Sequence, residues 1–400
     1  MAAQPRDPVV TKNQDTTGSV SRDDSDRLAT LDMLRGAAGF AVLFSHARAY
    51  SLQSYTELKL AGREIGLITK AFYAITSFGH EAVIIFFGLS GFLVGGKAAR
   101  DLFLKRFSWP HYLLRRMTRL WIVLLPALAA TFLFDALGIV INGGVGYGGQ
   151  FAATYNSGPS GDGTFDTSLL AFLGNLTFLQ TIVVPTYGTN SPLWSLANEF
   201  WYYIVFPLLG WVVLTQGAMA ARLLGAAVLV VLILILPSSI LWLGLIWLAG
   251  AIAGVISTNA RLLPFLTRIS VRILAISVLL GALGALGAAK VARLSIGDLE
   301  FGLIVACCLP ILAHMPSPGG WYRRIARSAS EISYTLYLTH FPLLSLLTFT
   351  MIAPTHYPPN ILGFCVFISL IVLATLWALL LYHLFERQTD RIYTALSRFL

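Results

Sequence analysis

The sequence predicts an all-α fold: a polytopic membrane helical bundle of about ten transmembrane helices with both termini cytoplasmic. Of its 400 residues, 56% are hydrophobic and only 12% are charged, about half the charged share of an average soluble protein. A soluble fold of this length would need far more polar surface. Apolar runs lie at about 34–50, 72–95, 120–140, 197–214, 219–237, 240–257, 271–289, 301–315, 332–352 and 361–385. Several are near the ~20 residues that a bilayer crossing needs, and a few are short and must be extended by flanking residues.

The distribution of basic residues predicts the orientation of these helices. Seven of the 28 Lys and Arg residues fall within 97–119, and none falls within 120–221. Because cytoplasmic loops collect Lys and Arg, the first segment is expected inside and the polar loop 142–167 outside. The remaining loop charges agree with this only if the apolar stretch 169–185 does not cross, so we predict a re-entrant or interfacial segment there. The net charge of +9 is therefore attributed to basic residues in cytoplasmic loops, and no nucleic-acid partner is expected.

Two further regions are defined by composition. Residues 1–30 are polar and predict a disordered cytoplasmic tail before a membrane domain at 31–390. The segment 281–288 (GALGALGA) places small residues at helical spacing, which predicts close packing of helices. Three cysteines lie in apolar runs without the spacing of zinc ligands, so no metal is expected.

Polar residues inside the spans are the main candidates for function, because each is costly in lipid unless it is used or paired. Arg35 and His46 are eleven residues apart in the first span, which places them within about 20° of one helix face. A neutral imidazole can accept a proton near pH 7, so His46 suits a general base. The alternative is that Arg35 reaches the inner interface and His46 only bonds a neighbouring helix.

A basic cluster precedes the third span. Arg115, Arg116 and Arg119 lie at helical spacing, and guanidinium groups bind phosphates in a bidentate manner. The alternative is a topology anchor or a lipid-headgroup contact. Glu199 begins the fourth span, near the predicted exterior; it can orient a sugar hydroxyl or a histidine, or simply face water.

Other polar positions are interpreted more simply. His340 lies within the ninth predicted span, after Tyr334, and alone is more often structural than catalytic. The Ser90-Gly91 pair favours close helix packing. His383 and Glu386, near the end of the last span, are expected at the interface.

Taken in order, five motifs resemble those of the integral-membrane acyltransferase 3 family, which includes O-antigen, nodulation-factor and macrolide-sugar O-acyltransferases. The resemblance covers roughly residues 28–390. The motifs are LDMLRGAAGFAVLFSHA, FFGLSGFLVGG, FLKRFSWPHYLLRRMTRLWIVLLP, PLWSLANEFWYYIVFP and ISYTLYLTHFP. The family's Gly-Val-Asp before the second motif is absent, because residues 80–85 here read HEAVII.

The resemblance implies an O-acetyltransferase that moves an acyl group, commonly acetyl from acetyl-CoA, to a carbohydrate hydroxyl. It makes His46, Arg35 and Glu199 the expected catalytic residues. The expected residues for binding the acyl-CoA donor are Arg115, Arg116, Arg119, His340 and Tyr334. Direct transfer and a relay through acylated His46 both remain open. The expected setting is a bacterial plasma membrane with its lipids as partners; alternatives are a small-molecule or lipid acceptor, or a transporter or flippase of the same topology.

Overall fold

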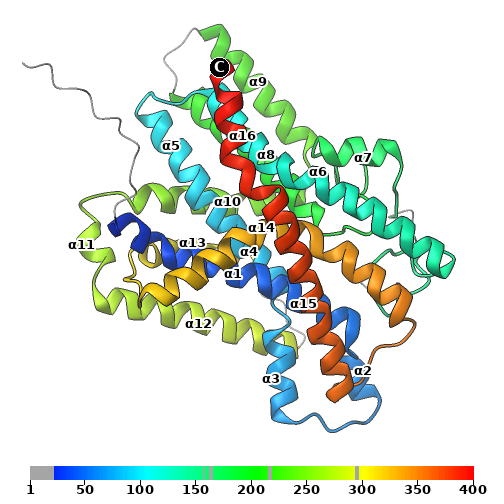
Figure 1. Cartoon of the computed structure of the whole chain (residues 1–400). Helices are drawn as coiled ribbons and strands as arrows, with labels where there is room; N and C mark the ends of the chain where they lie inside the picture. Colours follow the sequence, from blue (N-terminus) through cyan, green and yellow to red (C-terminus); the bar gives the residue numbers. More distant parts are fainter. Residues whose placement is uncertain (1–21, 156–157, 162–164, 215–218, 293–296) are drawn as a thin grey trace, which may run out of the picture.

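A computed structural model of the chain describes residues 22–155, 158–161, 165–214, 219–292 and 297–400. Within these ranges the chain forms helices and no strand, with three isolated bridges, so the predicted all-α class is confirmed (Figure 1). The helices are α1 (Arg22–Ser51), α2 (Tyr55–Leu60), α3 (Leu67–Ile75), α4 (Gly79–Ser90), η1 (Gly91–Gly95), α5 (Gly96–Phe103), α6 (Trp109–Asn142), α7 (Leu169–Leu176), α8 (Leu193–Leu214), α9 (Met219–Ile235), α10 (Ser238–Ile256), α11 (Leu263–Leu266), α12 (Ile269–Ala292), α13 (Asp298–Leu312), α14 (Gly320–Met351), α15 (Ile361–Leu384), η2 (Glu386–Gln388), α16 (Thr389–Leu396) and η3 (Ser397–Phe399).

In the described part of the chain, eight helical segments are long and apolar enough to cross a membrane. The other two predicted spans form helices at the predicted positions, α9 and α13. With 17 and 15 residues, they fall short of the roughly 20 residues that a bilayer requires. Helix α7 has 8 residues, or about 12 Å of length, so the stretch 169–185 contains no helix able to cross.

One boundary differs from the prediction. Helix α1 begins at Arg22, so residues 22–30 of the predicted tail are helical, and residues 1–21 lie outside the described residues. An apolar run marks the part of a helix that is buried, and it cannot locate the end of a helix that continues into water.

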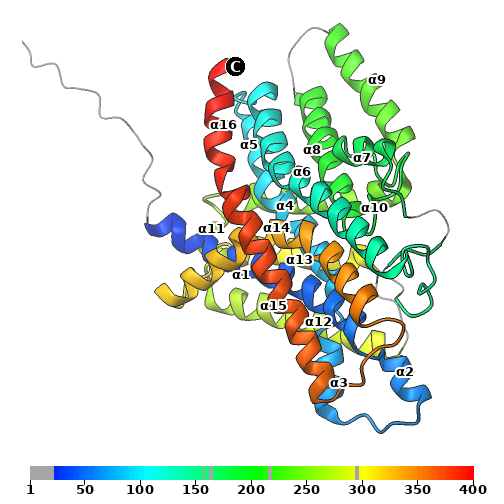
Figure 2. The same cartoon turned by 45° about the vertical axis from the view of Figure 1, so that its right-hand side comes forward.

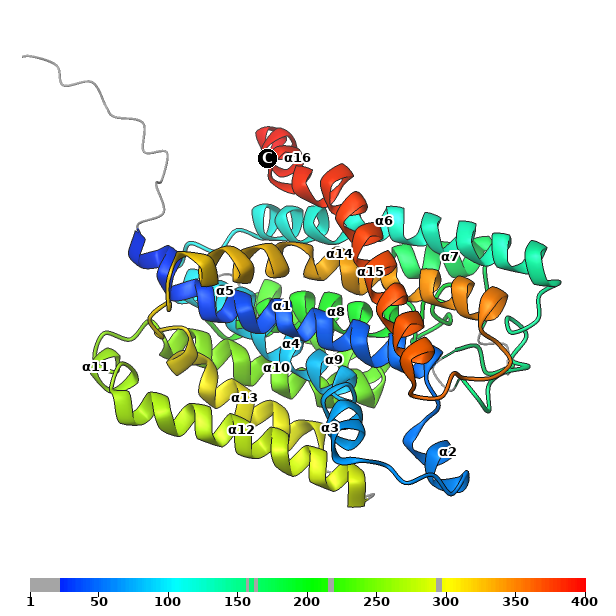
Figure 3. The same cartoon turned by 60° about the horizontal axis from the view of Figure 1, so that its bottom comes forward.

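Three long helices, α1, α14 and α6, lie side by side and organise the bundle (Figure 3). Helix α14 is central: 83% of its most apolar stretch is buried, against 11% for α12. Helices α9 and α12 therefore lie at the periphery, where exposed Leu, Ile and Val side chains suit contact with lipid acyl chains (Figure 2).

Helix α10 packs against α4 and η1 with their backbones in contact. A Cβ atom built at Gly91 would overlap the carbonyl oxygen of Trp247, and one at Gly250 would overlap that of Gly88. The packing prediction for Ser90-Gly91 is therefore confirmed at Gly91. The same prediction for 281–288 is wrong at Gly281 and Gly284, where nothing lies within 4 Å of an added Cβ, because α12 presents this face outward.

We expect Gly91→Ala to destabilise the protein by about 1–3 kcal/mol, the usual cost of forcing an extra carbon into a packed core. Thermal unfolding in detergent measures the effect as a lowered midpoint. Gly284→Ala is the matched control: it has open space and a better helix former, so its midpoint should stay equal or rise. Equal midpoints for the two variants would contradict the packing argument.

Pro342, inside α14, creates the place at which the loop before α8 attaches to this helix. A proline has no N–H, so it leaves the carbonyl four residues earlier, that of Leu338, without its helical donor. The side-chain amide of Asn190 donates to this carbonyl at 2.9 Å. Asn190 also donates to the hydroxyl of Thr131 at 3.1 Å, so one buried side chain joins α14, α6 and the start of α8.

Candidate active site

A cavity of about 1170 Å³ lies between α1, α4, α6, α8 and α14, with α5, η2 and α16 at its edge. Ten Lys and Arg side chains and six Asp and Glu side chains line it, so it carries an excess of positive charge. Its walls include six of the eight predicted site residues: Arg35, Arg115, Arg116, Arg119, Glu199 and Tyr334. The other two, His46 and His340, lie beyond its inner end.

Two of the predicted donor-binding arginines are held by aromatic rings. The guanidinium carbon of Arg115 lies 5.2 Å from the ring centre of Tyr393, and that of Arg116 lies 5.7 Å from the ring centre of Tyr203. Among the described side chains, no carboxylate lies within ion-pair distance of either. Cation–π contact fixes a guanidinium plane and leaves its N–H groups available, so both can bind an anion.

Arg119 has a different environment. It forms an ion pair of 2.8 Å with Glu386, and its guanidinium carbon lies 5.4 Å from the ring centre of Tyr334. The other carboxylate oxygen of Glu386 accepts bonds from the backbone N–H and the hydroxyl of Thr335. Glu386 is only 3% exposed, because the chain turns after α15 and brings this acid into the cavity wall.

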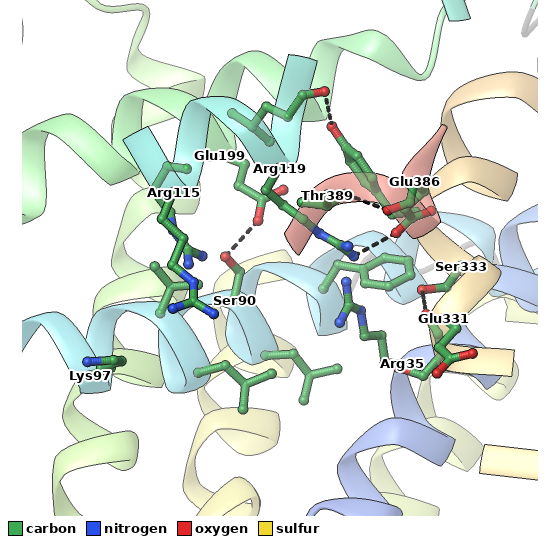
Figure 4. A pocket seen from close by; sticks show the side chains of 18 of the residues that line it. Arg35, Ser90, Lys97, Arg115, Arg119, Glu199, Glu331, Ser333, Glu386 and Thr389 are labelled. Carbon is green, nitrogen blue, oxygen red and sulfur yellow. Dashed lines mark hydrogen bonds and ion pairs between the residues drawn. The ribbon is translucent and has the colours of Figure 1, made fainter. Parts of the chain in front are cut away.

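Arg35 reaches the cavity from α1, and its guanidinium group lies beside that of Arg119 (Figure 4). The charges acting on it include Glu386, Glu199 and Asp32, but among the described residues none of them forms an ion pair with it. Three acids around one guanidinium group offset the repulsion between two neighbouring arginines.

Glu199, on α8, accepts a hydrogen bond from the hydroxyl of Ser90 at 2.7 Å (Figure 4) and another from Tyr203. The indole N–H of Trp247 donates to the Ser90 oxygen at 3.1 Å. These partners include no histidine, so Glu199 orients hydroxyl groups of the cavity wall. Ser90 is the last residue before the π-helical turn η1, a distortion frequent at functional sites.

His46 and His340 form a pair. Nδ1 of His46 lies 2.8 Å from Nε2 of His340, and the two ring planes are nearly parallel, inclined by 11° with ring centres 5.2 Å apart. His340 is fully buried and His46 is half-buried. The structure therefore brings His340 to His46 and away from the predicted donor-binding arginines.

Tyr337 links the cavity to the histidine pair. It lines the inner end of the cavity, and its ring centre lies 6.3 Å from that of His340. Its hydroxyl shares a hydrogen bond of 2.7 Å with Ser195. The cavity thus ends one aromatic ring away from the pair, whereas Arg35 and His46 are separated by about 16 Å along α1.

Sequence reasoning missed Glu386, and no local signal marked it, because its partners lie 51 and 267 positions away. It also left Tyr337 without a role. The motif that contains Tyr337 and His340 was a usable signal: a spacing of three residues places both on one face of α14.

Fold and site together define a helical membrane protein with a basic cavity embedded among its spans. A family model described as an acyltransferase domain matches residues 28–383. The chain belongs to the acyltransferase 3 family, and it is a membrane acyltransferase. Comparisons with curated proteins and with solved structures find no match.

Proposed function

We propose that the protein transfers an acyl group, acetyl being the expected one, from acyl-CoA on the cytoplasmic side to a carbohydrate hydroxyl on the exterior side. One observation carries the proposal. A large cavity, whose lining includes Arg115 and Arg116 held by aromatic rings, reaches a buried tyrosine in ring contact with a histidine pair. This arrangement would provide an anion-binding region in the cavity and a proton acceptor just beyond the tyrosine that lines it.

The donor suits the cavity in size and charge. Small-molecule sites usually occupy about 300–1,000 Å³, and this cavity is larger, at about 1170 Å³. Coenzyme A carries several phosphate charges at one end and the thioester at the other. Arg115 and Arg116 suit the phosphates, because a guanidinium group binds phosphate oxygens through two parallel hydrogen bonds.

The acyl-transfer step itself is assigned to His46. His46 accepts the proton of the acceptor hydroxyl, the oxygen attacks the thioester carbonyl, and the carbon–sulfur bond breaks. The proton held by His46 passes to the leaving CoA thiolate, so atoms and charge balance. The separation of about 16 Å between Arg35 and His46 favours Arg35 as a donor-binding residue over one that touches the reacting carbonyl.

Aromatic residues on the far side of His46 support a carbohydrate acceptor. Tyr50 follows His46 by one helical turn, and its ring contacts those of Phe341, Tyr155 and Phe349. Tyr155 comes from the loop predicted to be exterior. Burial raises the pKa of Tyr155 to about 12, so its hydroxyl stays protonated and able to donate. All four rings are buried; once opened to an acceptor, such aromatic faces with a few hydroxyl groups would suit the apolar faces and hydroxyls of sugars.

We expect Arg115→Gln and Arg116→Gln each to raise the KM for acetyl-CoA about tenfold or more, since losing a hydrogen bond to a charged group costs about 1.5–3 kcal/mol. The measurement is release of free CoA thiol by membranes supplied with acetyl-CoA and glycan acceptors, together with binding of a nonreactive thioether analogue.

Arg261→Gln and Arg268→Gln are the controls. Both positions lie on the same predicted side of the membrane, and neither lines the cavity. An unchanged KM in the Arg115 and Arg116 variants would show that phosphates bind elsewhere. Absence of any CoA release or analogue binding by the wild type, with a range of glycans, would overturn the proposed function.

A further inference from the structure

The hydrogen bonds of the histidine pair fix where its protons lie. Nδ1 of His340 is 2.8 Å from the backbone carbonyl oxygen of Leu336. A carbonyl can only accept, so Nδ1 of His340 carries the hydrogen, and Nε2 of the neutral ring carries a lone pair. His46 must then donate the 2.8 Å bond from its own Nδ1. The lone pair of His46 is thereby left on Nε2.

We propose that His340 is a positioning residue that selects the proton-accepting nitrogen of His46. This inference rests on the proposed function, in which His46 acts as the base. A neutral imidazole exchanges between two tautomers, and the hydrogen bond made by one nitrogen decides which tautomer is present. Without His340, the proton is free to move to Nε2, and the lone pair would then face α14 instead of the substrate.

The surrounding packing holds this arrangement. Phe341 places its ring edge-on to His46, with ring centres 4.9 Å apart. Among the described residues, the charged or titratable groups that act on His46 are His340 on α14 and Arg48 on α1. No carboxylate is among them, so the acceptor for the His46 Nδ1 hydrogen is the imidazole of His340.

The same hydrogen bond serves before and after proton transfer. Once Nε2 of His46 takes a proton from the acceptor hydroxyl, the ring becomes an imidazolium ion and still donates from Nδ1 to His340. No group has to rotate during the step, and a preorganised hydrogen-bond partner lowers the cost of the new charge. His340 thus acts through His46 and touches neither donor nor acceptor.

Two replacements of His340 separate this role from simple packing. In His340→Gln the side-chain carbonyl can reach the position of Nε2 and accept from His46. In His340→Asn the shorter amide cannot. We expect His340→Asn to lower kcat by about 10²-fold or more, within the range for losing a correctly placed base, with the KM for acetyl-CoA unchanged. His340→Gln should retain activity within about tenfold of the wild type.

Nitrogen-15 NMR of histidine-labelled protein in lipid supplies a second readout, with His46→Ala used to assign the His46 signals. Wild type and His340→Gln should show His46 protonated at Nδ1 and unprotonated at Nε2, and His340→Asn should lose this preference. Equal kcat in the Gln and Asn variants, or an unchanged His46 tautomer in His340→Asn, would overturn the inference. A wild type without acyl transfer would instead overturn the proposed function, because the tautomer is measured without turnover.

Discussion

His46→Ala is expected to reduce acyl transfer by about 10⁴-fold, the upper range for removing a general base, while acetyl-CoA still binds. The reason is spatial separation: the cavity that suits the donor is lined by other residues, and His46 lies beyond its inner end. Turnover is measured as CoA release in the presence of acceptor, and donor binding is measured with the thioether analogue. A normal affinity for the analogue shows that the variant is folded.

His314→Ala controls for the general loss of a histidine. Its ring is bonded to the carbonyl of Pro310 within its own helix region, and it does not line the cavity. Turnover close to that of the wild type is expected. Full activity in His46→Ala would remove His46 from the mechanism, and loss of analogue binding in that variant would show that His46 holds the donor.

Arg35→Gln is expected to lower kcat/KM for acetyl-CoA about 100-fold, mostly through a higher KM. The guanidinium group faces the cavity beside Arg119 (Figure 4), so its loss removes charge-assisted hydrogen bonds to the donor, each worth about 1.5–3 kcal/mol. Arg35→Lys keeps the charge but not the planar pair of donors, and should recover only part of the loss.

The division between kcat and KM tests where Arg35 acts. A residue that stabilises charge only in the transition state lowers kcat and leaves KM unchanged. That outcome would place the thioester near Arg35 and contradict the path to His46. Arg222→Gln is a suitable control, since Arg222 is half-buried, bonds the carbonyl of Val212 and lies outside the cavity.

The local parts of this architecture are readable from sequence. Apolar runs located the helices, and a shared helical face predicted that Arg35 and His46 both point into the bundle, where Arg35 lines the cavity and His46 meets His340. The basic residues before the third span were correctly expected to lie near one another, because spacings of three and four residues fix neighbours within a helix.

Contacts between distant segments are not readable in this way. His46 and His340 are 294 positions apart, and only the packing of α1 against α14 decides that their rings meet. From the sequence, Glu386 was expected at the interface. The turn after α15 brings it to Arg119, and the hydropathy of the sequence does not reveal that turn. Gly284 and Gly91 look alike as small residues in apolar helices, yet α10 covers only Gly91.

The backbone contact between α10 and η1 also has a mechanical consequence. Two helices that touch through carbonyl groups and glycines cannot slide without overlap, so this pair is expected to move as one rigid body carrying Ser90 and Trp247. The opposite wall is joined by longer side chains, the Arg119–Glu386 ion pair and the contact of Arg115 with Tyr393. Such contacts separate and re-form easily, so a ligand would widen the cavity on the side of α6 and α16, with the glycine-packed wall as the fixed support.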